Sequence, residues 1–335
     1  MPYTIKDVAK KANVSIATVS RILNNQTGYS EKTKKKVLTV IEELGYHPNA
    51  VARGLVNKRT HTIGVLVPAL SSMFVAEVLD GIEKAANEAG SSIIVCHTES
   101  NGEKTMNYLQ LLNEKRIDGI IFTSGILKDE YYEFTSKMKI PMVLLATLSH
   151  KHPVPYVKVD DYKASYAAAE YLVAKGHTKI GMISGNKMDI IAGIPRIEGF
   201  KKALEDHGIS VNEKNVVYCE GFAFLDGVEG SRKLLEQNPE LTAIFAASDE
   251  LAIGAYSTLY QMDLRVPDDL SIIGYDNLSI AKMSIPPLTT VEQPLIKMGE
   301  EAARMVFSML ESGEAAKSRI MPHQMIERLS VKEKG

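Results

Sequence analysis

Apolar positions divide the chain into two parts with different periods. Up to residue 46, apolar side chains recur at helical spacing in three short stretches. From Thr62 onward, short apolar runs bounded by turn residues alternate with longer amphipathic stretches. The first pattern predicts small helices, and the second predicts strands that alternate with helices. A length of 335 residues exceeds what one hydrophobic core usually serves, so we expect two or three domains.

Capping residues mark where the three N-terminal helices begin. Thr4 starts the first helix with Asp7 as its capping partner, and Ser15 and Ser30 cap the second and third. Asn13 suits the tight turn between the first two helices, because asparagine tolerates left-handed backbone. Two helices joined by so short a turn predict a helix-turn-helix.

The second helix has an outward face that the small core cannot use. Its residues are Ile16, Ala17, Ser20, Arg21 and Asn24. A small apolar pair suits thymine methyl groups in the major groove, and an arginine can donate two hydrogen bonds to a guanine edge. This face therefore favours base recognition in double-stranded DNA.

Charge is distributed unevenly between the two parts. Residues 1–60 carry eleven Lys and Arg against four acidic residues, which is +7 and leaves −9 for the rest of the chain. Lys32 and residues 34–36, all lysines, crowd the first turns of the third helix, where the helix dipole disfavours cations. A nearby phosphate backbone would offset that cost. A solvated basic face without a partner is the alternative.

The next segment, HPNAVARGL, predicts a helix of about two turns that starts at Pro48. Because a helix this short is marginal alone, we expect it to fold only when a partner holds it. Leu55 would then be available as an apolar wedge in a minor groove. A plain linker helix is the alternative.

The larger part predicts two lobes of parallel sheet with helices on both faces. Ligands bind such folds at the carboxyl ends of the strands, where this chain places Asp160, Ser248, Asp249 and Asp276. Each could instead cap a following helix. Arg196 is expected as a lone cation over a cleft lined with carboxylates, which suits a polyhydroxylated ligand. The strand-like runs are TIGVLVP, SSIIVCH, IDGIIFTS, PMVLLAT, YVKVD, KIGMISG, NVVYCEG, TAIFAAS and SIIGYDN.

Several classes of protein are disfavoured by missing motifs. The sequence has no G-x-G-x-x-G, no phosphate-binding P-loop and no G-x-S-x-G, so we expect no enzyme, no catalytic residue and no cofactor. His150 and His152 are expected in an exposed loop and not in a metal site. Cys96 and Cys219 are expected as buried free thiols. Without an export signal or a run of 18 apolar residues, we expect a cytoplasmic protein with no membrane partner.

The stretch TIKDVAKKANVSIATVSRILN followed by GYHPNAVARGL resembles the lactose-repressor (LacI/GalR) family of bacterial transcription regulators. ASDELAIGA, VPDDLSIIGYDN and PPLTTVEQP resemble the effector domain of that family. The resemblance implies a small all-α helix-turn-helix domain plus hinge helix, followed by an α/β periplasmic-binding-protein-like domain of two doubly wound parallel-sheet lobes. The expected domains are 1–47, 48–60 and 61–335, with an N-lobe at about 61–161 and 292–322 and a C-lobe at about 162–290 and 323–331.

The resemblance also implies two sets of site residues. The family often stacks an aromatic side chain on the effector where this chain has Ala223, and Phe222 or Phe224 would have to substitute for it. The implied DNA contacts are Thr4, Ser15, Ile16, Ala17, Thr18, Ser20, Arg21, Asn24, Lys35, Asn49, Ala52 and Leu55. The implied effector contacts are Phe74, Asp160, Arg196, Phe222, Ser248, Asp276 and Gln293.

The expected function is a repressor that binds a pseudo-palindromic operator under the control of a small-molecule effector, a sugar or sugar derivative. No leucine heptad follows IERLSVKEKG, so we do not expect a tetramer of the lactose-repressor kind. We expect a homodimer, whose two-fold symmetry would match the operator. The alternative is a global catabolite regulator with a phosphoprotein corepressor. Lys297 argues against this alternative, because that regulator has an acidic residue at the matching position. A solute-binding protein for transport would have no use for residues 1–60.

Overall fold

The computed structural model describes residues 3–23, 27–46, 59–99, 102–123 and 125–334. The chain forms two compact units, Met1–His61 and Thr62–Gly335. The hinge helix expected after Pro48 lies outside the described residues.

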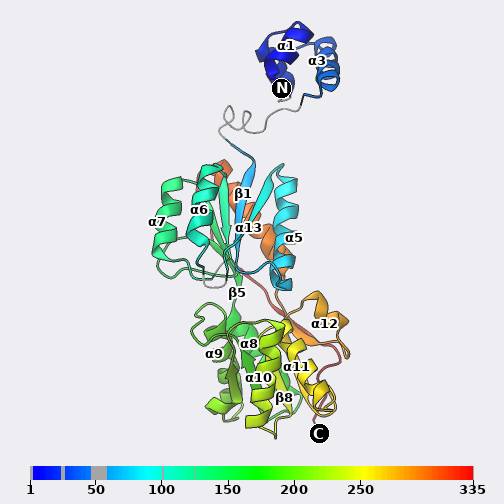
Figure 1. Ribbon diagram of the computed structural model, residues 1–335. Helices are drawn as coiled ribbons and strands as arrows, with labels where there is room; N and C mark the ends of the chain where they lie inside the picture. The colour runs from blue at the N-terminus through cyan, green and yellow to red at the C-terminus, as the bar shows by residue number, and fades with distance from the viewer. Residues whose placement is uncertain (1–2, 24–26, 47–58, 100–101, 124, 335) are drawn as a thin grey trace. The chain divides into compact units, whose positions relative to one another are not determined.

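The first unit contains helices α1 (Ile5–Ala12), α2 (Ile16–Leu23) and α3 (Glu31–Leu44) (Figure 1). They pack around a small apolar core, as the helical spacing predicts. The buried members of this core are Val8, Ala9, Ala12, Val19, Ile22, Val37 and Val40.

The predicted caps of these helices are confirmed. The backbone N–H and the hydroxyl of Thr4 donate to Asp7 Oδ2 at 2.8 and 2.7 Å. Ser15 Oγ accepts from the backbone N–H of Thr18 at 3.1 Å, and Ser30 caps α3 in the same way. Asn13 has a φ of 51°, so the turn between α1 and α2 uses the left-handed conformation that asparagine tolerates.

The N-lobe of the second unit contains a parallel sheet of six strands in the order β11-β5-β4-β3-β1-β2. One apolar cluster lies under α5 (Met73–Glu88) and α13 (Leu295–Ser312), and another lies under α6 (Thr105–Glu114) and α7 (Asp129–Met138) on the other face (Figure 1). The strands are β1 (Thr62–Val67), β2 (Ser92–His97), β3 (Gly119–Phe122), β4 (Met142–Leu145), β5 (Tyr156–Val159) and β11 (Arg319–Met321).

The C-lobe has a second six-stranded sheet in the order β12-β10-β9-β8-β6-β7. Its strands are β6 (Ile180–Ser184), β7 (Val216–Tyr218), β8 (Ala243–Ala246), β9 (Ser271–Asp276), β10 (Thr289–Glu292) and β12 (Gln324–Ile326). Its helices are α8 (Asp161–Ala174), α9 (Gly193–Asp206), α10 (Phe224–Gln237), α11 (Asp249–Gln261), the short α12 (Ser279–Met283) and the 3-10 turn η1 (Glu213–Asn215).

One edge strand departs from the predicted all-parallel sheets. Strand β12 pairs antiparallel with β10, whereas every other pairing in this sheet is parallel. The chain returns from β11 in the N-lobe to β12 after only two residues. Strand β10 leads out of the C-lobe toward α13, whereas β12 leads into the C-lobe directly from β11, so the two neighbouring strands run in opposite directions.

The chain passes from one lobe to the other at three places, after β5, after β10 and after β11. Helix α8 of the C-lobe begins directly after β5 of the N-lobe, so residues 158–161 form a junction between the two lobes. No described helix is long and apolar enough to cross a membrane.

Candidate functional site

The outward face predicted for α2 is present. Ile16 is 46% exposed, and Ser15, Ala17 and Arg21 are also exposed. Thr18 and Ser20 are half-buried, and the Thr18 hydroxyl lies 2.9 Å from Ser15 Oγ. The base-reading hypothesis requires apolar side chains that the core leaves free to contact DNA, and the exposed Ile16 and Ala17 meet that requirement.

The remaining residues expected at DNA fall into two groups. Thr4, which caps α1, and Lys35, on α3, are exposed. Asn24, Asn49, Ala52 and Leu55 lie outside the described residues, so their predicted roles stay predictions.

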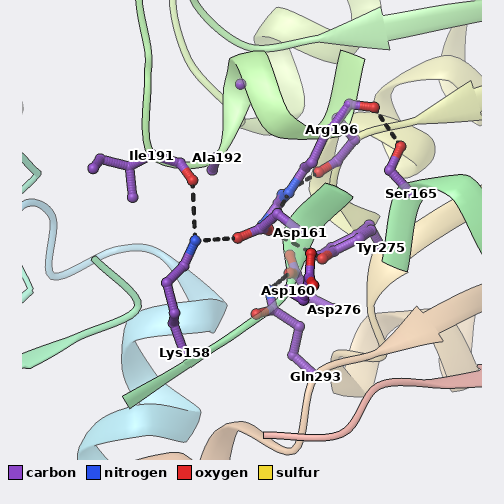
Figure 2. A network of polar contacts seen from close by, with 12 residues as sticks. Lys158, Asp160, Asp161, Ser165, Ile191, Ala192, Arg196, Tyr275, Asp276 and Gln293 are labelled. Atoms are coloured by element: carbon purple, nitrogen blue, oxygen red, sulfur yellow. Dashed lines mark hydrogen bonds and ion pairs between the residues drawn. The ribbon is translucent and has the colours of Figure 1, made fainter. Parts of the chain in front are cut away.

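Arg196 is not the lone cation that the sequence predicts. Its side chain is buried, and Nε donates to Asp161 Oδ1 at 2.8 Å (Figure 2). Nη1 donates to the Ala247 carbonyl at 2.6 Å. The guanidinium carbon lies 3.8 Å from the ring centre of Tyr275. The prediction missed this because the partners of Arg196 come from three other segments of the chain.

Asp161 is the centre of this network and was not predicted. Its carboxylate accepts from Lys158 Nζ at 2.8 Å and from the Tyr275 hydroxyl at 3.0 Å, besides Arg196 (Figure 2). Burial would raise the pKa of Asp161, but the charges of Arg196 and Lys158 outweigh burial and hold it below the ordinary value. A lysine inside the otherwise apolar strand YVKVD was the signal, since a buried cation requires a buried carboxylate.

Close helix packing brings Asp161 and Arg196 together. Helices α8 and α9 meet at Gly199, where an added Cβ would lie 2.1 Å from the carbonyl oxygen of Tyr162. A glycine is therefore needed for α9 to approach α8 closely enough for the ion pair.

Asp276 ends β9 in a strained backbone conformation. Its φ is 113°, a region that side chains other than glycine rarely adopt, and such strain is concentrated at functional sites. Gln293 Nε2 donates to its Oδ1 at 2.7 Å (Figure 2). Burial raises the pKa of Asp276 to about 7, against the opposing influence of the Arg196 charge and the Gln293 hydrogen bond.

Two predicted cleft residues cap helices. Asp160 Oδ1 accepts from the backbone N–H of Lys163 at 3.1 Å at the start of α8. Ser248 Oγ accepts from the N–H of Leu251 at 3.0 Å and donates to the Phe222 carbonyl at 2.8 Å. The capping alternative therefore describes both side chains, although each still lies at the carboxyl end of a strand.

Asp249 is fully buried and has a different set of partners. It accepts from the backbone N–H of Leu278 at 2.7 Å and from the Thr290 hydroxyl at 2.5 Å. Burial raises the pKa of Asp249 well above its ordinary value. The residue thus ties α11 to β10 and to the segment after β9.

Phe222 is a second aromatic residue beside Arg196, farther from the guanidinium than Tyr275. The guanidinium carbon lies 5.5 Å from its ring centre, and an added Cβ at Gly185 would come within 2.5 Å of the ring. Phe224 is instead 40% exposed at the start of α10. Phe74 is half-buried against the apolar core of the N-lobe, on α5.

Two smaller expectations need correction. His152 is not exposed: its ring stacks on Tyr132 with centres 4.0 Å apart, and Nε2 lies 2.9 Å from Asp129 Oδ1. No group of side chains fit to hold a metal ion is found in the described part of the chain. Cys96 is a buried free thiol as predicted, whereas Cys219 is free but only half-buried.

Both units match models of one protein family. Residues 4–49 match the model described as bacterial regulatory proteins, lacI family, and residues 60–328 match periplasmic binding proteins and sugar binding domain of LacI family. Catabolite control protein A of Priestia megaterium is 38% identical over 333 residues, which cover 99% of this chain and all of that protein.

Two solved structures extend this similarity to the fold. The lac repressor dimer bound to operator and the anti-inducer ONPF has a TM-score of 0.89 at 26% identity, covering 99% of this chain and 100% of that one. The complex of the transcriptional regulator CelR with cellobiose has a TM-score of 0.74 at 29% identity, covering 98% of this chain and 99% of that one. The chain therefore belongs to the LacI family of bacterial regulatory proteins and is a transcriptional regulator.

Proposed function

We propose that this regulator is a repressor that binds a pseudo-palindromic operator as a homodimer and responds to a sugar or sugar derivative. The observation that carries the proposal is the buried group of Arg196, Asp276 and Gln293 in a domain that matches a sugar-binding model. Asp276 and Gln293 lie at the carboxyl ends of β9 and β10, and Arg196 lies on α9. Carboxylates and guanidinium groups can each bind two hydroxyls at once, as a sugar offers. The relative solved with cellobiose supports the same class of ligand.

The proposal assigns roles to the two sets of residues predicted from the sequence. The exposed face of α2, together with Thr4, Lys35 and residues 49–55, would contact the operator. Phe222, Asp160, Ser248 and Phe74 would complete the effector site around the Arg196 group. We further propose domain limits of 1–47, 48–60 and 61–335, no catalytic activity and a cytoplasmic location, because the relatives compared are transcription regulators.

A second candidate is a global catabolite regulator whose corepressor is a phosphorylated protein. The 38% identity to catabolite control protein A favours it. Lys297 disfavours it, because this exposed cation on α13 replaces the acidic residue expected there. Operator binding that requires a phosphoprotein, and that no sugar changes, would support this candidate.

Thermal melting of the full chain with a panel of sugars tests the effector assignment. A ligand at about 100 times its dissociation constant stabilises the folded state by about 2.7 kcal/mol. We expect at least one neutral mono- or disaccharide to raise the melting temperature of the second unit by about 5–10 °C. Purine bases and sugar phosphates serve as comparison ligands. A panel in which only those compounds shift the transition would contradict the sugar assignment.

Replacing Arg21 or Lys35 with alanine tests the DNA face. We expect Arg21→Ala to relax specificity at one base pair of each half-site at a cost of about 1–3 kcal/mol, because a guanine edge loses a bidentate donor. Lys35→Ala should weaken binding to all sequences alike, as loss of a phosphate contact does. Competition between the selected operator and single-base variants measures both effects. Equal loss of specific and non-specific binding in Arg21→Ala would reduce Arg21 to a phosphate contact.

A further inference from the structure

Two glutamates that belong to neither set of predicted site residues bind across the boundary between the lobes. Glu250, on α11 of the C-lobe, accepts from the Ser72 hydroxyl at 3.2 Å and from the backbone N–H of Met73 at 3.1 Å. Ser72 and Met73 start α5 of the N-lobe. The Ser72 hydroxyl makes no cap of its own to α5, so a carboxylate of the opposite lobe caps this helix.

A second bridge runs in the opposite direction. Glu77 lies on α5 of the N-lobe, and its Oε1 accepts from the backbone N–H and the hydroxyl of Ser279 at 3.2 and 3.3 Å. Ser279 starts α12 in the C-lobe. Each lobe therefore supplies one carboxylate to the other, and α5 takes part in both bridges.

The segment after Asp276 joins these bridges to the effector site. Leu278 is fully buried in the apolar core of the N-lobe, and Ile280 packs against the same core. The backbone N–H of Leu278 donates to Asp249, which directly precedes Glu250. Residues 276–280 are thus bound to both lobes at once, and their first member is the strained Asp276.

We propose that Glu250 and Glu77 form an interlobe latch that holds α5, α11 and α12 together and positions Asp276 for the effector. The latch goes beyond the proposed function, and its closure does not require that the effector be a sugar. Burial raises the pKa of Glu250, so closing the lobes removes hydration from its charge, and the two hydrogen bonds offset only part of this cost. A contact that gains so little from closure is suited to opening and closing.

Amide hydrogen exchange of the full chain without ligand tests whether the bridges act together. In Glu250→Ala we expect the Met73 amide to exchange about tenfold faster, because its acceptor is gone. We expect the Ser279 amide to accelerate by a similar factor although its own acceptor, Glu77, is unchanged. Glu77→Ala should produce the same pair of effects. All rates are compared with amides of the buried strand residues Val65 and Ile273, which report global unfolding.

Glu83→Ala is the matched control, because Glu83 lies on the same helix as Glu77 and accepts from Asn87 of that helix. It should leave both amides unchanged. Acceleration only at the amide whose acceptor was removed would overturn the proposal, since the bridges would then be independent contacts. Acceleration no greater than that of Val65 and Ile273 would overturn it as well. Because no sugar is present, failure here leaves the effector assignment unaffected.

Discussion

Arg196→Ala is expected to destabilise the second unit by about 3–5 kcal/mol, the usual cost of removing one partner of a buried ion pair. The substitution leaves the buried Asp161 carboxylate with Lys158 as its remaining cationic partner and removes the guanidinium from the face of Tyr275. It should also abolish the effector response. Urea unfolding of the variant and the parent chain measures the loss of stability.

Lys202→Ala provides the control on the same helix. Lys202 is exposed and pairs with Asp206 and Glu205 within α9, so its loss should change the free energy of unfolding by less than about 0.5 kcal/mol. An Arg196→Ala protein as stable as Lys202→Ala would mean that the Asp161 network contributes little. Arg196 would then act only as a ligand group.

Asp276→Asn is expected to stabilise the folded protein at pH 8 while abolishing its response to effector. Burial raises the pKa of Asp276 from 3.8 to about 7, and that difference corresponds to about 4 kcal/mol of cost for the ionised form as an upper limit. Asparagine retains an oxygen that accepts from Gln293 without carrying the charge. We therefore expect a gain of about 2–4 kcal/mol in urea unfolding at pH 8.

The gain should depend on pH with a definite sign. Because the pKa is raised on folding, the cost of ionised Asp276 is complete above about pH 7 and disappears as the pH falls toward 3.8. The advantage of Asp276→Asn should therefore shrink between pH 7 and pH 4. Asp80→Asn, at an exposed position of α5, should show no such trend. If the stability gain of Asp276→Asn stayed constant across this range, the ionised carboxylate of Asp276 would not destabilise the folded protein.

Local signals explain why the first unit was predicted closely. The caps at Thr4, Ser15 and Ser30 and the left-handed turn at Asn13 each depend on residues within three or four positions of one another. A sequence contains such short-range information directly. The alternating strands of the second unit were found for the same reason, because each is a continuous apolar run.

The candidate site was predicted only in part, because its chemistry depends on distant partners. Asp276 and Gln293 were identified, and the structure joins them by a hydrogen bond. Asp161 was missed and Arg196 was described as unpaired, because Asp161 on α8, Arg196 on α9 and Tyr275 on β9 are brought together only by the fold. The edge strand β12 was not predicted as antiparallel because three residues carry too weak a pattern.

Operator binding measured by fluorescence anisotropy with and without the stabilising sugar tests most directly whether the site around Asp276 controls DNA binding. The duplex is the pseudo-palindromic site obtained by selection with the parent chain. We expect the sugar to change operator affinity about 5–150-fold, as a coupling free energy of about 1–3 kcal/mol does. Asp276→Asn should bind the operator like the parent and show no change with the sugar. An equal response in parent and variant, or none in the parent, would contradict the account.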